Sequence, residues 1–319
     1  METILIDGLS FALPLFVIAT GGIYSEKSGI INLALEGLQG VGAFVGALSV
    51  ILMADLLGYS QGSMFYIAMI ASIAGGMLYS MLHAALCIKF RANQIISGIV
   101  INILAVALTT FLTSVVNHLI VGEASNKFQL GVSSRFTVPM LSEIPFLGGL
   151  FKNMYPFEIV ILVIAVLAWY ILYKTRFGMR LQACGDNPHA VDATGGNVEK
   201  IRFIAVLISG ALSGLGGICF AYSLMANFSP SIYMGYGYLA IASMIFGNWK
   251  ISTTFAACLF FGFAKSAGYQ LCLNMNLSSN FSDLFLILPY ALTLILLMFF
   301  SKHNCPPKAL GEIFDKESR

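Results

Sequence analysis

The residues of this sequence that could do chemistry are a few polar side chains set inside apolar stretches. Asn32 and Glu36 lie in INLALEGLQGVGAFVGA, four residues apart and so on one face of a helix, and Asn102 lies in GIVINILAVALTTF. An ionised carboxylate in hydrocarbon is costly unless it faces protein or water. Such groups either bond one helix to another or line a path for a polar solute. Both interpretations stay open, and Asn32, Glu36 and Asn102 are our first candidates for a substrate path.

Aromatic side chains supply two further candidates, Phe228 and Tyr236, in YSLMANFSPSIYMGYGYLAIASMIFGNW. Glycines interrupt this apolar segment, and such broken segments provide irregular backbone beside a cavity in membrane proteins. Aromatic faces stack on planar rings such as nucleobases, although tyrosines at the end of a span are also typical of an interfacial belt. Lys265, in LFFGFAKSAGYQ, could pair with Glu36, reach the outer surface or face a wet cavity.

Motifs for covalent chemistry are missing from the sequence. It contains no GxxxxGK[ST], HExxH or GxSxG, and its six cysteines lack metal-type spacing. No series of acidic residues runs through the apolar stretches, as a proton relay would require. We therefore expect no catalytic residue, no metal ligand and no cofactor bound by this chain. Its activity must be passive or be powered by an attached partner.

The elements that carry these residues are membrane spans. Hydrophobic residues make up 58% of the chain and charged residues 10%, against about 25% charged in soluble proteins. Stretches of about 20 apolar residues can cross a bilayer. We predict an all-α polytopic membrane protein with nine spans, near residues 6–25, 29–52, 64–88, 95–118, 157–173, 202–222, 235–248, 252–270 and 283–300. The seventh span is short and broken by glycine.

The distribution of lysines and arginines predicts which loops face the cytoplasm, because cytoplasmic loops of membrane proteins carry the excess of positive charge. With the N-terminus outside and the C-terminus inside, only Lys127, Arg135 and Lys152 lie outside. The inner segments then hold Lys27, Lys89, Arg91, Lys174, Arg176, Arg180, Lys200, Arg202, Lys250, Lys302, Lys308, Lys316 and Arg319. This orientation makes 1–300 a transmembrane domain with an extracytoplasmic segment at 119–156 and a cytoplasmic loop at 174–202. The tail 301–319 is polar and proline-broken, and we expect it to be cytoplasmic and mobile.

The loop between the fifth and sixth spans contains the signals of a short helix. Asp186 or Asn187 can cap it, Pro188 suits its first position, and Gly195 tolerates the backbone conformation that ends a helix. These signals predict about two helical turns over 189–194. The helix is either an ordinary feature of the loop or a rigid docking helix that a soluble partner protein binds.

Several stretches resemble a known family of membrane proteins. SEKSGIINLALEGLQGVGAF (25–44) is similar to its ERxGxxNIGLEG-type motif, and GMRLQACGDNPHAVDATGGNV (178–198) is similar to its GxRLRAxGxNPxAAxxxGxxV loop. The stretches at 93–112, 235–249 and 288–294 fit as well. The family comprises permease subunits of binding-protein-dependent ABC importers of the ribose and branched-chain amino acid group. The resemblance is strongest to the nucleoside-uptake branch and weak over the outer segment 119–156.

The resemblance implies the ABC importer permease fold and assigns the loop helix as a coupling helix that sits in a groove of a cytoplasmic ABC ATPase. Its residues would be Gly185, Asp186, Asn187, Pro188, His189, Ala190, Ala193 and Gly195. It also implies a second homologous permease subunit and an extracytoplasmic solute-binding protein or lipoprotein as partners. ATP and Mg would be used by the partner ATPase, and no nucleic acid would bind. The chain departs from the family at Gly235-Tyr236-Gly237, where relatives often carry Gly-Arg-Gly.

We therefore expect a translocation subunit, not an enzyme, in a prokaryotic cytoplasmic membrane, with nucleosides as its solutes. The alternatives are a permease for a sugar or a branched-chain amino acid, and a self-sufficient secondary transporter.

Overall fold

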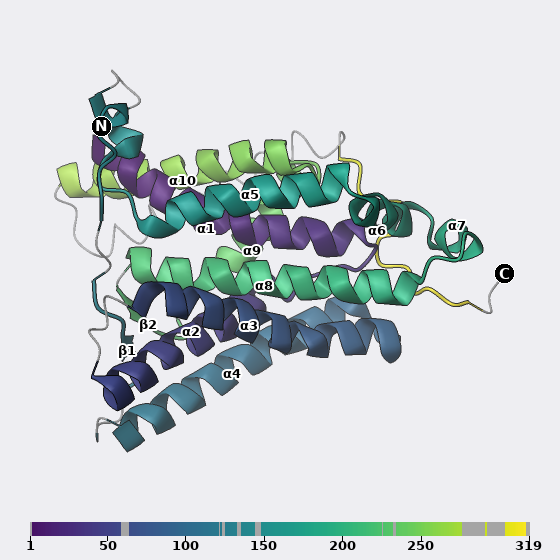
Figure 1. Cartoon of the computed structure of the whole chain (residues 1–319), viewed down its shortest axis with the longest axis horizontal. Helices are drawn as coiled ribbons and strands as arrows, with labels where there is room; N and C mark the ends of the chain where they lie inside the picture. Colours follow the sequence, from purple (N-terminus) through teal and green to yellow (C-terminus); the bar gives the residue numbers. More distant parts are fainter. Residues whose placement is uncertain are drawn as a thin grey trace.

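The chain folds into a bundle of long helices that run side by side (Figure 1). The computed structural model describes residues 2–58, 64–120, 122, 125–132, 135–143, 148–224, 226–231, 234–275, 291 and 304–316. Over these residues, seven helices are long and apolar enough to cross a membrane. They are α1 (Glu2–Lys27), α2 (Leu35–Leu57), α3 (Phe65–Ala84, continued by a π-helical turn at Ala85–Lys89), α4 (Gln94–Ile120), α5 (Pro156–Lys174), α8 (Val198–Leu224) and α10 (Ile251–Asn274).

The structure confirms a polytopic all-α architecture but not the expected count of nine spans. The seventh expected span, 235–248, forms α9 (Tyr236–Phe246), whose 11 residues make a helix about 16 Å long, roughly half the thickness of a bilayer core. The second span begins later than expected, because residues 28–34 are irregular before α2 starts at Leu35. The ninth expected span, 283–300, lies outside the described residues.

Helix α8 lies at the centre of the bundle, packed against α1, α2 and α3. Glycines allow its backbone to approach its neighbours closely. A Cβ on Gly214 would lie 2.2 Å from the carbonyl oxygen of Ser72 in α3, and one on Gly217 would lie 2.2 Å from that of Gln39 in α2. Close approach through small residues is typical of helix packing in membranes, where water does not drive association. The core of the molecule therefore surrounds α8.

The two ends of the bundle differ. At one end, β1 (Phe128–Gln129) pairs antiparallel with β2 (Asn227–Phe228), and the 3₁₀ turns Leu141–Glu143 and Gly148–Phe151 of the outer segment lie at this end as well, where the second turn contacts α1 (Figure 1). We call this the sheet end. The opposite end holds α6 (Arg176–Asp186), α7 (Pro188–Ala193) and the C-terminal segment, and we call it the α7 end (Figure 1). The segments that the sequence assigns to opposite sides of a membrane thus lie at opposite ends.

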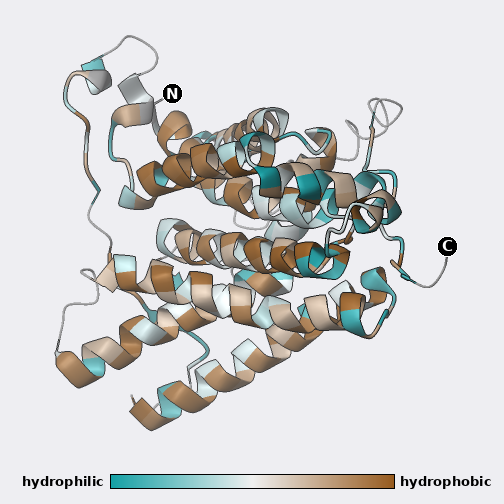
Figure 2. Cartoon of the chain, turned by 45° about the vertical axis from the view of Figure 1, so that its right-hand side comes forward, coloured by the Kyte–Doolittle hydropathy of each residue, from teal (hydrophilic) through white to brown (hydrophobic). Residues whose placement is uncertain are grey.

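The outward faces of α4 and α5 carry large apolar side chains that are exposed among the described residues. Ile103 and Phe111 on α4 and Val166 on α5 are each about two-thirds exposed. Figure 2 shows hydrophobic residues along the helices, whereas hydrophilic residues gather near the C-terminus. Apolar surface of this extent would promote aggregation in water and suits contact with lipid. The chain is a multi-pass membrane protein.

The C-terminal segment 304–316 corrects the expectation of a mobile tail, because it packs against the α7 end. The amide of Ala309 donates to the carbonyl of Gly185 (2.8 Å), and that of Gly311 donates to the carbonyl of Gly29 (3.0 Å). The buried Arg202 of α8 donates from Nε to the carbonyl of Ser28 (3.0 Å) and from Nη1 to that of Glu312 (2.9 Å). The tail thereby joins α6 and α8 to the turn after α1.

Candidate functional site

The predicted loop helix exists as α7. The side chain of Asn187 accepts a hydrogen bond from the amide of Ala190 (3.0 Å), so Asn187 is the cap, and Pro188 occupies the first helical position. Gly195 follows with φ of +80°, a conformation that strains any residue with a Cβ. The helix begins one residue before the predicted range 189–194. The second proposed cap, Asp186, is instead the last residue of α6.

Helix α6 is an element that our interpretation of the sequence missed. Its cap is Thr175, whose hydroxyl accepts from the amide of Gly178 (3.2 Å), and Leu181 and Cys184 form its buried face. Burial raises the pKa of the Cys184 thiol to about 11, so this cysteine is protonated and unreactive at neutral pH. The Thr175 cap and the apolar spacing of RFGMRLQACGD were the signals that could have predicted this helix.

The residues assigned to coupling divide into a buried base and an exposed face. Gly185 and Pro188 are buried, and a Cβ on Gly185 would lie 2.2 Å from the carbonyl oxygen of Lys27 at the end of α1. Asp186, Asn187, His189, Ala190, Ala193 and Gly195 are exposed. The base fixes the position of α7 on the bundle, while the small side chains of Ala190 and Ala193 allow another protein to approach it closely.

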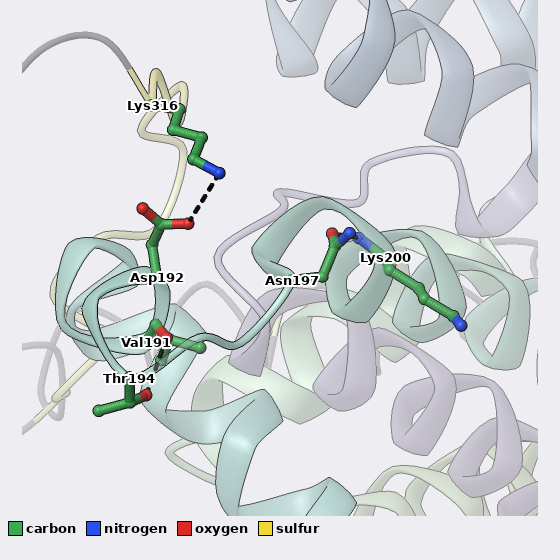
Figure 3. A network of polar contacts seen from close by, with 6 residues as sticks. All are labelled: Val191, Asp192, Thr194, Asn197, Lys200 and Lys316. Carbon is green, nitrogen blue, oxygen red and sulfur yellow. Dashed lines mark hydrogen bonds and ion pairs between the residues drawn. The ribbon is translucent and has the colours of Figure 1, made fainter.

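Side-chain contacts hold α7 on this base (Figure 3). Val191 is 6% exposed and belongs to the core that includes Leu181 and Val198. Asp192 forms an ion pair with Lys316 of the C-terminal segment (3.8 Å), and the ring of His189 lies 5.3 Å from that of Phe314. Helix α7 is therefore attached both to the bundle and to the tail.

Polar residues near the start of α2 form hydrogen bonds that join α2 to α4 and α9. Glu36 accepts a hydrogen bond from the amide of Gly235 (2.9 Å) and also interacts with the amides of Gly237 and Tyr238, so its carboxylate caps α9. Gly235 has φ of +91°, which favours glycine. Asn102 of α4 accepts from the amide of Gly37 (2.8 Å). The bond from Gly235 to Glu36 lies at the start of the seventh predicted span.

The other bonds of this region join α4 to α9 and join the irregular stretch 28–34 to α4 and α8, so Asn32 does not share a helix face with Glu36 as the sequence predicted. The side-chain amide of Asn102 donates to the carbonyl of Leu33 (2.8 Å) and to the hydroxyl of Tyr238 (3.2 Å). Asn32 is fully buried and donates to the hydroxyl of Ser209 in α8 (2.9 Å). Asn32, Glu36 and Asn102 thus have the contacts expected of interhelical bonds, and their place in a substrate path stays a prediction.

A cavity of about 700 Å³ lies between α1, α8, α10 and the outer segment at the sheet end. Small-molecule sites typically measure about 300–1,000 Å³. Its wall combines aromatic rings, cationic side chains and hydroxyl groups. The lining residues include Asp7, Ser10, Phe11, Lys127, Arg135, Ser229, Ser231, Tyr236, Lys265 and Tyr269.

Of the five path candidates, only Tyr236 is among the described residues that line this cavity. Phe228, a residue of β2, is fully buried, with its ring centroid 5.9 Å from that of Phe44 and 6.1 Å from that of Phe128. The irregular backbone between β2 and α9 contributes Ser229 and Ser231 to the wall. The segment around β2 and the start of α9 thus borders a cavity, and the assignment of its aromatic residues to a substrate path stays a prediction.

Lys265 of α10 faces the cavity, which decides among the three positions that the sequence left open. Its ammonium donates to the hydroxyl of Tyr236 (2.6 Å) and lies 3.8 Å from the ring centroid of Phe11. Asp7 and Ser10 of α1 line the same space, and we did not single them out. Ser10 and Phe11 follow Asp7 by three and four residues, a spacing that marks one helix face and was a usable signal.

Known proteins resemble the chain over nearly its whole length. The family model described as the branched-chain amino acid transport system / permease component matches residues 4–297. The guanosine ABC transporter permease protein NupQ of Bacillus subtilis is 37% identical, covering 98% of this chain and 96% of that protein. The nucleoside ABC transporter permease protein NupC of Lactococcus lactis is 35% identical, with 98% and 96% covered. The guanosine ABC transporter permease protein NupP of B. subtilis is 27% identical, with 81% and 70% covered.

Proposed function

The chain belongs to the family of branched-chain amino acid transport system permease components, and on that premise we propose that it is the permease subunit of an ABC importer for nucleosides. Two relatives of matching length are named as guanosine and nucleoside ABC transporter permeases. The chain would form the translocation path and carry out no covalent chemistry. ATP hydrolysis, with its Mg, would take place in a separate ATPase subunit.

The observation that carries this proposal is the construction of α7. A coupling element must be rigid, exposed and able to fit a groove in another protein. Asn187, Pro188 and Val191 fix α7 on the bundle, and Ala190 and Ala193 give it a face without bulk or charge. An ABC ATPase docked on this face could transmit its closure to α8 through the core that contains Val191.

The assembly that we propose also contains a second permease and a solute-binding protein. B. subtilis has two guanosine ABC transporter permease proteins, NupQ and NupP, that both resemble this chain, which favours a heteromeric pair. The uncovered apolar faces of the bundle leave room for such a neighbour as well as for lipid. The binding protein would deliver nucleosides at the sheet end, where the cavity lies.

We further propose that the membrane is the cytoplasmic membrane of a prokaryote, with the sheet end outside and the α7 end in the cytoplasm. The test uses single cysteines at the exposed positions Asn126 and Lys200. The protein that carries these single cysteines also needs Cys305→Ser, because Cys305 is exposed and would react, whereas the other five native cysteines are buried. An impermeant maleimide should label position 126 in intact cells and position 200 only after the membrane is opened. Labelling of position 200 in intact cells would reverse the orientation.

Reconstitution tests the function itself. Vesicles that contain this chain, a second permease, the ATPase and the binding protein should accumulate radiolabelled nucleosides only when ATP is present on the α7 side. Omitting the ATPase should reduce uptake to the level of empty vesicles. Nucleoside uptake without the ATPase would show a secondary transporter. ATP-dependent uptake of a sugar in place of nucleosides would retain the importer and refute the solute.

A further inference from the structure

The wall of the cavity includes an ammonium group that rests on aromatic rings. The Nζ atom of Lys265 lies 3.8 Å from the ring centroid of Phe11 and 4.2 Å from that of Tyr236. The Phe11 and Tyr236 rings contact each other at 5.1 Å, and both contact Phe220 at about the same distance. Ring faces attract a cation and replace part of its hydration shell. Within the described part of the chain, Lys265 has no ion-pair partner, so its charge is available to a ligand.

The hydrogen bonds that Lys265 can still make define what it would recognise. An ammonium group has three donors and no acceptor. One donor is used by the hydroxyl of Tyr236, at 2.6 Å. The others can be satisfied in the cavity by water or by acceptor atoms of a solute. A solute that presents an amino group to Lys265 would place a donor against donors and leave both unsatisfied, which is costly in a desolvated site.

Because the ammonium of Lys265 offers only donors, it discriminates among nucleosides by the acceptor atoms of their bases. Guanine presents two neighbouring acceptors, N7 and O6, and a lysine that contacts both is one of the common ways in which proteins select this base. Hypoxanthine has the same two atoms. Adenine has N7 but carries an amino group in place of O6. A 6-oxopurine could therefore satisfy the free donors of Lys265, whereas a 6-aminopurine could not.

We propose that Lys265 is a specificity-determining residue of the permease, which selects 6-oxopurine nucleosides over 6-aminopurine nucleosides in the cavity lined by Phe11 and Tyr236. The proposal rests on the proposed function, since it specifies which nucleosides pass. Tyr236 positions the ammonium group, because its hydroxyl accepts a hydrogen bond from one of the three N–H donors of Lys265. The hydroxyl groups of Ser229 and Ser231, in the same cavity, can meet the hydroxyl groups of a ribose.

The test measures binding to the permease without the binding protein, whose own selectivity would obscure the result. The complex of both permeases and the ATPase is placed in nanodiscs, and equilibrium binding of labelled guanosine, inosine and adenosine is measured. The wild-type complex should bind guanosine and inosine about 10- to 100-fold more tightly than adenosine. Lys265→Met, which keeps an unbranched side chain without the ammonium, should bring the three affinities to within about threefold and leave adenosine binding unchanged.

Two matched variants complete the test. Lys200→Met removes an exposed lysine at the start of α8, which does not line this cavity, and should keep the wild-type preference. Lys265→Arg keeps the charge and the donors and should keep the preference for 6-oxopurines. If Lys265→Met binds neither purine, the Lys265→Arg complex decides, since loss of preference there would overturn the proposal.

An unchanged preference in Lys265→Met would overturn the role of Lys265, as would a wild-type complex that binds no purine nucleoside. Tighter binding of guanosine monophosphate than of guanosine would show that the ammonium recognises a phosphate instead of the base. These outcomes leave the proposed function standing when the complete importer still takes up nucleosides. Failure of nucleoside uptake by the complete wild-type importer would refute the proposed function itself.

Discussion

Arginine in place of Ala190 or Ala193 is expected to abolish solute-stimulated ATP hydrolysis and uptake together in the reconstituted importer. Both residues lie on the exposed face of α7, and an arginine there would hold the ATPase away and bury an unpaired charge in the interface. An uncompensated buried charge costs about 3–5 kcal/mol, which corresponds to a loss of roughly 100- to 1,000-fold in affinity or more. The permease should still purify as a folded protein, because neither side chain contributes to the core.

Serine at the same two positions is the matched control. Ala190→Ser and Ala193→Ser keep the side chain small and uncharged, so coupling should be retained within about twofold, as for other surface substitutions of this size. Co-purification of the ATPase with each permease variant measures docking independently of transport. Full uptake and full co-purification of the ATPase in Ala190→Arg would contradict the assignment of α7 as the coupling helix.

Alanine in place of Glu36 is expected to destabilise the permease, because it removes the carboxylate that caps α9. The amide of Gly235 would lose its acceptor at a site without bulk water, at a cost of about 1–3 kcal/mol. The loss should appear as a lower midpoint of thermal unfolding in nanodiscs and a lower yield of assembled importer. Glu36→Gln retains a carbonyl oxygen in the same place and should stay closer to the wild type in both measurements.

The Glu36 variants also separate the two interpretations that the sequence left open. If Glu36 fastens helices, uptake per assembled complex should stay close to the wild-type level in Glu36→Gln. Uptake that falls in Glu36→Gln while stability is unchanged would instead assign Glu36 to the path. Glu199→Ala, which removes an exposed carboxylate at the start of α8, is the control and should change neither stability nor uptake.

Sequence patterns predicted the features that depend only on residues close together in the sequence. Hydropathy is local, so α1, α3, α4, α5, α8 and α10 lie within a few residues of the expected spans. The cap and ends of α7 were equally predictable, because Asn187, Pro188 and Gly195 act on backbone only two or three residues away. Glu36 and Asn102 were recognised as residues that need partners, for the same physical reason that makes any polar group costly in hydrocarbon.

The sequence did not predict features that arise from distant contacts. Glu36 accepts a hydrogen bond from the amide of Gly235 at the start of α9, and nothing in the local sequence specifies that bond. The site of Lys265 requires α1 to bring Phe11 against α10, which only the folded bundle shows. The family resemblance covered the coupling loop and most of the spans, but it assigned no role to Lys265.

The packed tail has a consequence for the time at which the molecule is completed. Residues 304–316 are synthesised well after Gly29, Gly185 and Arg202, with which they form hydrogen bonds. Until this segment has been made, those groups lack these partners and the base of α7 is incomplete. A chain that stops before residue 304 can therefore insert the helices that precede it but cannot complete the surface that carries α7. Completion of the α7 end thus follows insertion of the helices and depends on synthesis of the segment 304–316.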